Sequence, residues 1–280
     1  MYEFRLIGYP IQHSLSPWIH RKLLERSGLT GNYRLYEITP DDDFGEKIIQ
    51  LMDAEVDGFN VTVPYKQKII PYLDELDPVS KEMEAVNTVL RKDGKWIGYN
   101  TDGIGYLRSL DSAVPDFFHN FDKNILIIGA GGAARAIYYA LVDKGFSEVD
   151  IANRTKEKAV DIAKLGKTDT NTVVYSIEEA RERLQYYDLI IQTTSVGMKS
   201  ISLEPIINID ELKHHAIVSD IVYQPIRTQF LQDAKKQGAR LVFGHTMLLY
   251  QAQYSFEIWT GERVDVTGLE QKLFQILEGR

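Results

Sequence analysis

The chain contains no cysteine, and this absence removes several kinds of chemistry at once. A disulfide framework, a thiolate metal site and a cysteine nucleophile all need that residue. The histidines do not supply a metal site instead, because they lack metal-ligand spacing and the adjacent His214 and His215 point to different faces of a helix or strand. We therefore expect surface histidines, no metal ion, and catalysis by other side chains.

Long apolar runs and an excess of positive charge are also missing. No stretch reaches the roughly 18 apolar residues that a membrane span needs, and the N-terminus MYEFRLIGYP has no basic segment followed by a long apolar one. We therefore expect a cytoplasmic protein without a membrane partner. The formal net charge of -8 argues against a nucleic-acid partner, because binding to the phosphate backbone needs a basic face.

The composition is that of a folded globular protein, with 44% hydrophobic and 26% charged residues. The 280 residues favour about two domains of roughly 100–200 residues each, with a single large domain as the alternative. Strand-like and helix-like stretches alternate from the start, which predicts an α/β fold. We expect one unit over residues 1–103, a second over 104–240, and helices over 241–280.

Local signals place several elements in the first unit. FRLIGYP predicts a strand, and Ser16-Pro17 predicts the N-cap and first position of a helix that ends at Gly28. Asp41 to Asp43 opens a second helix, and GFNVTV is a strand ended by a proline. The turn Asp93-Gly94 predicts a hairpin, because both positions suit positive backbone angles.

The second unit begins with the apolar run Ile125 to Ile128, which is typical of a strand buried on both faces of a parallel sheet. Further predicted strands are EVDIAN, TVVY, DLIIQTT, AIVSDIVY and ARLVFG.

A glycine-rich turn follows the apolar run directly. It consists of Gly129, Ala130, Gly131, Gly132, Ala133 and Ala134. In this G-x-G-x-x-A pattern, Gly129 permits the tight turn, Gly131 lets a pyrophosphate approach backbone N–H groups, and Ala134 lets helix and strand pack closely. A simple tight turn is the alternative. The strand, turn and helix context favours a dinucleotide, with its phosphates at the positive end of the helix.

The second strand of this unit ends without the acidic residue that usually accepts from the ribose hydroxyls of NAD. Asn153, Arg154 and Thr155 stand there instead, and Lys158 lies one turn further on. The guanidinium of Arg154 suits a 2′-phosphate, which favours NADP. The alternative is that Arg154 is a solvated charge at the start of the next helix, a position that the helix dipole disfavours for a cation.

Polar side chains also gather at element ends in the first unit. Ser14 and Ser16 place two hydroxyls beside a helix N-terminus, which suits a carboxylate, although Ser16 alone is more simply a cap. Lys66, Asn87 and Asp102 add an ammonium, an amide and a carboxylate near strand ends, where ligands bind in open α/β sheets. Taken singly, each is more often a solvated or structural residue.

The chain resembles the shikimate dehydrogenase family in a series of motifs that spans residues 8 to about 261. In order, these are GYPIQHSLSPWIH, DGFNVTVPYK, EAVNTV, GYNTDGIGY, GAGGAARA, NRT, TTSVGM, DIVYQPIRT and GHTMLLYQA. The resemblance implies an α/β substrate-binding domain, a Rossmann-like doubly wound NADP-binding domain, and C-terminal helices that pack back on the first domain. It implies reversible NADPH-dependent reduction of 3-dehydroshikimate to shikimate on the route to chorismate and aromatic amino acids, by a monomer or homodimer.

The family's site residues carry over onto matching positions of this sequence. Ser14 and Ser16 match the hydroxyls that hold the substrate carboxylate, and Lys66 and Asp102 match the catalytic pair. The residues that match other substrate contacts are Thr62, Asn87, Tyr223 and Gln251. The residues that match dinucleotide contacts are Gly129 to Ala133, Asn153, Arg154, Thr155, Lys158, Thr194, Ser195, Ile221 and Gly244.

Three departures from the family pattern occur, and none removes a catalytic group. Glu84 stands where glycine is common, His245-Thr246 changes a glycine-containing stretch, and Lys158 replaces a second arginine of some members. Two other functions stay open at this point. One is a relative that also oxidises quinate or prefers NAD, and the other is a non-catalytic NADPH sensor, which would lack the lysine–aspartate pair.

Overall fold

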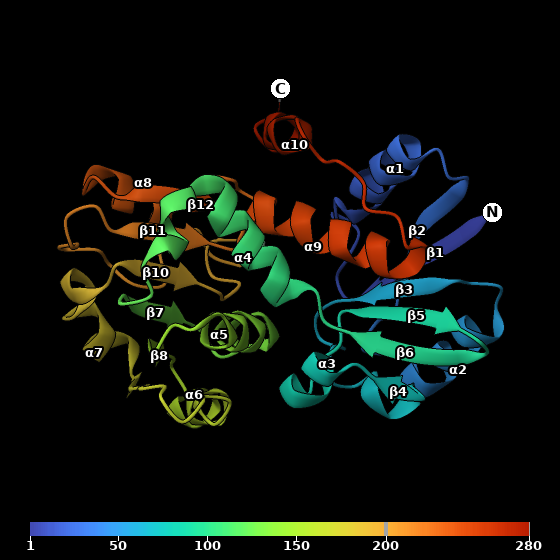
Figure 1. Cartoon of the computed structure of the whole chain (residues 1–280), viewed down its shortest axis with the longest axis horizontal. Coiled ribbons are helices and arrows are strands. Elements are labelled where there is room, and N and C mark those ends of the chain that lie inside the picture. Colours follow the sequence, from blue (N-terminus) through green and yellow to red (C-terminus); the bar gives the residue numbers. More distant parts are fainter. Residues whose placement is uncertain (199–200, 280) are drawn as a thin grey trace. The chain divides into compact units, whose positions relative to one another are not determined.

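The computed structural model describes residues 1–198 and 201–279. The chain forms two compact units (Figure 1). The first unit contains Met1–Asp102 and Gln251–Thr267, and the second contains Gly103–Tyr250 and Gly268–Arg280. The predicted α/β fold with two domains is therefore confirmed.

The first unit is built on a mixed sheet with the strand order β2-β1-β3-β5-β6-β4. Its strands are β1 (Tyr2–Gly8), β2 (Gly31–Glu37), β3 (Gly58–Val61), β4 (Glu75–Leu76), β5 (Thr88–Lys92) and β6 (Lys95–Tyr99). Its helices are α1 (Ser16–Ser27), α2 (Phe44–Asp53), η1 (Ile70–Tyr72), α3 (Pro78–Met83) and the part of α9 (Gly244–Thr260) from Gln251 onward. The strands β1, β2 and β3 are parallel, so their carboxyl ends meet at one edge.

Both faces of this sheet are buried. Along β1, Phe4 and Leu6 pack in a cluster with Trp259 of α9, whereas Ile7 packs in a cluster with Phe44 of α2. Alternation along a strand sends neighbouring side chains to opposite faces, and each face is therefore covered by helices.

The second unit is built on a parallel sheet with the strand order β12-β11-β10-β7-β8-β9. Its strands are β7 (Asn124–Ile128), β8 (Glu148–Ala152), β9 (Val174–Tyr175), β10 (Leu189–Gln192), β11 (Ile217–Asp220) and β12 (Arg240–Phe243). Its helices are α4 (Asp102–Ala113), η2 (Pro115–His119), α5 (Gly132–Lys144), α6 (Lys156–Ala163), α7 (Ile177–Arg181), η3 (Leu184–Tyr186), α8 (Gln229–Lys236), the start of α9, and α10 (Leu269–Leu277).

Helices cover both faces of the parallel sheet, as the apolar run of β7 predicts. Ile125 and Ile127 pack in a cluster with α4 and α5, whereas Leu126 and Ile128 pack in a cluster with α7 and α8. In Figure 1, α5 and α7 accordingly lie on opposite sides of the stacked strands. The strand order reverses between β7 and β10, which is the switch point where ligands bind in doubly wound folds.

The start of α1 differs from the prediction. Ser16 is not the N-cap: Leu15 precedes the helix without a side-chain cap, and Ser16 is already helical. The reason is that the Ser14 hydroxyl, two residues earlier, accepts from the Ser16 N–H at 3.2 Å. The predicted end is confirmed, because Gly28 adopts a left-handed conformation with φ of 71°.

Two other local predictions are confirmed. Asp43 caps α2, with its carboxylate accepting from the Glu46 N–H at 2.9 Å. Asp93 and Gly94 have φ of 52° and 78°, and they join the antiparallel strands β5 and β6. The side chains therefore set these boundaries locally, as expected for caps and tight turns.

The C-terminal region divides differently from the predicted single segment over 241–280. Residues Gln251–Thr267 group with the first unit, whereas α10 groups with the second. Contacts within the second unit explain this: Glu270 of α10 accepts from Ser112 at 3.2 Å, and Glu278 forms an ion pair with Arg227 at 2.9 Å. Helical periodicity predicts that α10 is a helix, but it does not identify the surface on which the helix packs.

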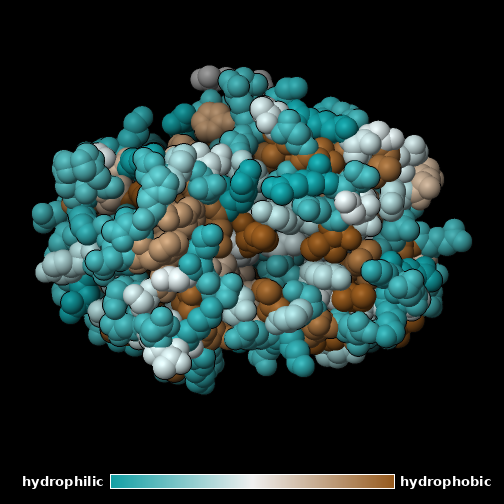
Figure 2. Space-filling model, in the orientation of Figure 1, coloured by the Kyte–Doolittle hydropathy of each residue, from teal (hydrophilic) through white to brown (hydrophobic). Residues whose placement is uncertain are grey.

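The surface is largely hydrophilic on the face drawn in Figure 2. Among the residues that the structure describes, no helix has both the length and the apolar character for crossing a bilayer. The predicted surface position is confirmed for His214 and His215, whose side chains are exposed. It is wrong for His20 and His245, whose rings are buried among aromatic side chains. The described ranges also contain no cluster of side chains suited to a metal ion.

Candidate active site

A lysine and an aspartate form a shielded ion pair in the first unit. Lys66 follows β3 and Asp102 begins α4, and Lys66 Nζ lies 2.5 Å from Asp102 Oδ2. The two side chains are only 16% and 7% exposed. A buried pair of this kind contributes little to stability, so its presence favours a chemical role.

Asn87 holds the second oxygen of the Asp102 carboxylate. Its amide Nδ2 donates to Asp102 Oδ1 at 2.8 Å, and its Oδ1 accepts from the Thr101 N–H at 2.8 Å. These two bonds fix which end of the amide faces the carboxylate. The Asp102 N–H donates in turn to Asn100 Oδ1 at 3.0 Å, so backbone and side chain of Asp102 are both anchored. The predicted residues Lys66, Asn87 and Asp102 thus lie together.

A buried polar network that contacts Asn87 was not predicted from the sequence. Asn60 Nδ2 donates to Asn87 O at 3.0 Å and to Ser255 Oγ at 3.1 Å. Ser255 Oγ also contacts Thr101 Oγ1 at 3.2 Å. Asn60 and Thr101 lie inside two of the family motifs. Ser255 lies in α9, far along the chain, and no local sequence pattern connects it to Asn60 or Thr101. The network therefore joins α9 to Asn87, the residue that holds Asp102 of the ion pair.

The serine pair lies at the start of α1. Ser14 Oγ donates to Ser16 Oγ at 3.2 Å, so the two hydroxyls are adjacent as predicted. Ser16 is buried, and its hydroxyl also interacts with the phenol of Tyr33, whose pKa is raised by burial. Tyr33 donates to Asn60 Oδ1 at 2.8 Å. Tyr33 therefore links the serine pair to the polar network that contacts Asn87.

The remaining predicted substrate contacts fall in both units. Thr62 follows β3, and its N–H donates to Ile7 O at 2.9 Å. Gln251 lies in α9, where its carbonyl accepts from Ser255 at 2.9 Å. Tyr223 belongs to the second unit and follows β11.

The glycine-rich turn has the geometry that its sequence predicts. Gly129 has φ of 117°, and an added Cβ would lie 2.5 Å from Thr193 Oγ1. At Gly131 an added Cβ would meet nothing within 4 Å, so the backbone has open space beside it. Gly131 precedes α5 without a side-chain cap. The turn therefore suits a pyrophosphate, because backbone N–H groups at a helix N-terminus need acceptors.

The predicted 2′-phosphate residues lie between β8 and α6. Asn153 Nδ2 donates to Thr155 O at 2.8 Å, which closes this turn. Arg154 is exposed, and we find no ion pair for it within residues 1–198 and 201–279. Lys156 nearby is instead paired with Glu179 at 2.6 Å. Lys158 is exposed on α6. An exposed guanidinium at the end of β8 suits the phosphate of NADP.

The other predicted dinucleotide contacts follow β10 and β11. Thr194 and Ser195 stand in the loop after β10, and Ile221 follows β11. An added Cβ at Gly244 would lie 2.3 Å from Ile221 O, so only glycine fits beside that carbonyl. Asp220, which is buried at the end of β11 within the motif DIVYQPIRT, was not predicted from the sequence. Burial raises the pKa of the Asp220 carboxyl to about 7.

The departures from the family pattern are accommodated. Glu84 adopts the left-handed conformation, with φ of 48°, at the C-cap of α3, which explains why glycine suits this position. His245 is buried against Phe274, with ring centroids 5.4 Å apart. Burial lowers the pKa of His245 to about 4, so the neutral ring is favoured.

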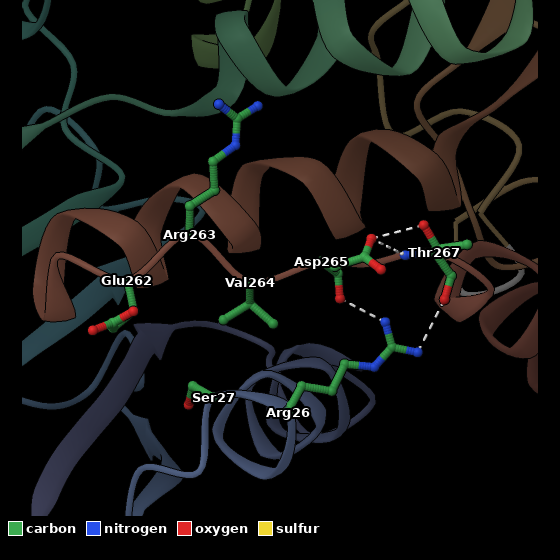
Figure 3. Close-up of a pocket in the computed structure, with 7 residues that line it drawn as sticks. All are labelled: Arg26, Ser27, Glu262, Arg263, Val264, Asp265 and Thr267. Atoms are coloured by element: carbon green, nitrogen blue, oxygen red, sulfur yellow. Dashed lines mark hydrogen bonds between the residues drawn. The ribbon is translucent and has the colours of Figure 1, made fainter.

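A surface pocket of about 590 Å³ in the first unit is separate from the predicted residues. It is lined by Arg26, Ser27, Glu262, Arg263, Val264, Asp265 and Thr267. As Figure 3 shows, the Arg26 guanidinium reaches two backbone carbonyls, Asp265 O at 2.6 Å and Thr267 O at 3.0 Å. Arg26 therefore joins α1 to the segment after α9, which is a structural role.

Three family models match consecutive parts of the chain. The shikimate dehydrogenase substrate binding domain matches residues 6–89, and shikimate / quinate 5-dehydrogenase matches residues 113–225. The shikimate 5′-dehydrogenase C-terminal domain matches residues 244–274.

Individual relatives agree with the family models. A shikimate dehydrogenase (NADP(+)) from Oceanobacillus iheyensis is 53% identical over 280 residues, covering 99% of both chains. A shikimate dehydrogenase crystallised with NADP+ has a TM-score of 0.89 at 36% identity, covering 99% of this chain and 96% of the other. The Thermus thermophilus enzyme with NADP(H) and shikimate has a TM-score of 0.82 at 33% identity, covering 98% of both chains. Sequence and structure agree along nearly the whole length, and the chain belongs to the shikimate dehydrogenase family.

Proposed function

We propose that this chain catalyses the reversible, NADPH-dependent reduction of 3-dehydroshikimate to shikimate, a step toward chorismate and the aromatic amino acids. The observation that carries the proposal is the shielded Lys66–Asp102 ion pair, in a chain 53% identical to a shikimate dehydrogenase (NADP(+)). When bound, NADPH supplies the hydride that reduces the ring ketone.

Lys66 acts as the general acid. Its ammonium donates a proton to the ketone oxygen as negative charge develops there, and the same charge stabilises that oxygen beforehand. Asp102 orients the ammonium through the 2.5 Å contact and accepts from a substrate hydroxyl. In the reverse direction, neutral Lys66 takes the proton from the hydroxyl of shikimate.

Asn87 keeps the Asp102 carboxylate in place. Its amide donates to Asp102 Oδ1 at 2.8 Å, and Lys66 contacts the other oxygen, Oδ2. Ser14 and Ser16 bind the substrate carboxylate with hydroxyl donors near the start of α1. Thr62, Tyr223 and Gln251 contact the ring and its hydroxyls.

The second unit holds the cofactor. The open backbone at Gly131 and the start of α5, which has no side-chain cap, suit the pyrophosphate. Arg154, which has no ion pair among the described residues, suits the 2′-phosphate. Asn153, Thr155 and Lys158 add donors beside Arg154. The loops that carry Thr194, Ser195, Ile221 and Gly244 complete the dinucleotide site.

The rate of shikimate oxidation, followed by the absorbance of the NADPH that forms, tests the proposal. We expect rapid oxidation of shikimate with NADP+, slower reaction with NAD+, and slower reaction with quinate. Equal rates with quinate or NAD+ would indicate the broader specificity of a quinate/shikimate enzyme. Absence of turnover in protein that binds NADPH would instead favour a cofactor sensor.

A further inference from the structure

A buried carboxylate joins three segments at the end of β11. Asp220 is 0% exposed, and its Oδ1 accepts from the Val222 N–H at 2.9 Å and from Gln192 Nε2 at 3.1 Å. Its Oδ2 contacts Thr228 Oγ1 at 2.6 Å. Val222 and Thr228 bound the loop after β11, so the carboxylate holds both ends of that loop.

Gln192 extends the cluster to the loop after β10. Its Nε2 also donates to Val196 O at 2.9 Å, and its Oε1 accepts from the Thr194 N–H. The Gln192 amide thus spans the turn that contains Thr194 and Ser195. Through this amide, Asp220 fixes the loops after two neighbouring parallel strands, and both loops carry proposed cofactor contacts.

The topology indicates which half of the cofactor these loops face. The pyrophosphate turn follows β7, and Arg154 at the end of β8 suits the adenosine 2′-phosphate. The order β12-β11-β10-β7-β8-β9 places β10 and β11 on the opposite side of β7 from β8. A dinucleotide bound across the switch point therefore has its nicotinamide half over β10 and β11.

We propose that Asp220 is a positioning residue that shapes the loops after β10 and β11 for the nicotinamide half of NADP. This inference rests on the proposed function. Removing the carboxylate leaves the Val222 N–H, the Gln192 amide and the Thr228 hydroxyl without their buried acceptor, so both loops must rearrange. The adenosine half, which binds along β7 and β8, depends on neither loop.

Asp150 offers a matched control in the same unit. It is a half-buried aspartate, and it too accepts from one backbone N–H and one hydroxyl, Val173 N at 2.7 Å and Tyr187 OH at 2.7 Å. Burial raises the pKa of its carboxyl as well. Its partners lie outside the loops after β10 and β11, so Asp150→Ala reproduces the loss of a hydrogen-bonded carboxylate without disturbing those loops.

Titration calorimetry with NADP+ and with 2′,5′-ADP, which lacks the nicotinamide half, tests the inference. In Asp220→Ala the dissociation constant for NADP+ should rise about tenfold or more, whereas that for 2′,5′-ADP should change less than about twofold. Asp220→Asn should restore NADP+ binding, because its amide can donate to Thr228 while its oxygen accepts from Val222 and Gln192. Asp150→Ala should leave the ratio of the two constants unchanged.

Other outcomes overturn the inference. Equal weakening of both ligands in Asp220→Ala, or the same ratio change in Asp150→Ala, would mean that Asp220 only supports the fold. If Asp220→Ala does not fold, Thr228→Val removes one hydroxyl of the cluster, and a normal ratio in that variant would contradict the inference. Wild-type protein that fails to bind NADP+ would refute the proposed function itself, which separates the two failures.

Discussion

Lys66 Nζ lies 2.5 Å from Asp102 Oδ2, although 36 positions separate the two residues in the chain. The sheet of the first unit brings them together, since Lys66 follows β3 and Asp102 follows β6. Asn87, which precedes β5 between these strands, then binds the free oxygen of the carboxylate. The strand order β3-β5-β6 thus brings together Lys66, Asp102 and Asn87, which we propose as the acid, the carboxylate that orients it and the amide that holds this carboxylate.

Arg154 should determine the preference for NADP. Charge-assisted hydrogen bonds contribute roughly 1.5–3 kcal/mol each, so Arg154→Ala should weaken NADP+ use by about ten- to a hundredfold. NAD+ use should change little, because NAD lacks the 2′-phosphate. Steady-state kinetics with both cofactors check this, and equal losses with both would assign Arg154 a structural role.

The serine pair should bind the substrate carboxylate. Replacing Ser14 and Ser16 together by alanine removes two donors to a charged acceptor, so the Michaelis constant for shikimate should rise about tenfold or more. The dissociation constant for NADP+ should stay near the wild-type value. A normal Michaelis constant in a folded double variant would show that the two serines only stabilise the start of α1.

Glu84 should carry a backbone cost that glycine removes. A side chain in the left-handed region costs roughly 1–2 kcal/mol, and Glu84 has φ of 48°. Glu84→Gly should therefore be more stable than Glu84→Ala by about 1 kcal/mol, because both lose the same side-chain interactions. Urea unfolding of the two variants measures the difference, and equal stabilities would show that the conformation is unstrained.

His20 should make the protein less stable in acid. The ring is fully buried and stacks on Tyr33 at 4.1 Å, and burial lowers the pKa of His20 to about 3. Below about pH 6.5 the unfolded chain binds a proton that the folded chain excludes, so the unfolding free energy falls by up to about 1.4 kcal/mol per pH unit down to about pH 3.

Urea unfolding between about pH 7 and pH 5 tests this dependence. In His20→Phe the decline should be shallower than in the wild type. The exposed His119→Phe, as a control, should follow the wild-type curve. Parallel curves for His20→Phe and wild type would show that other groups cause the acid sensitivity.

Motifs with a local mechanism were predictable from the sequence. The glycine-rich turn and the Asp93-Gly94 hairpin depend on backbone angles that few residues adopt, so the residue types identify them. Arg154 was predictable because its place at the end of β8 follows from the same strand and turn pattern.

Contacts between distant segments were not predictable in this way. Ser255 reaches Thr88 across 167 positions at 2.7 Å, and Asp220 reaches Gln192 across 28 positions at 3.1 Å. Nothing near Ser255 or Asp220 in the chain signals these partners, because tertiary packing creates the contact. The same holds for α10, whose periodicity predicts a helix but leaves its packing surface undefined.

The turnover number of Lys66→Ala tests the central claim most directly. General acid–base catalysis typically contributes about 10²–10⁴-fold, so the variant should lose that much turnover while binding shikimate with nearly wild-type affinity. Asp102→Asn should impair turnover and binding together, and the double variant should be little worse than the poorer single variant. Near-normal turnover in folded Lys66→Ala would contradict the assignment of Lys66 as the acid and, with it, the proposed mechanism.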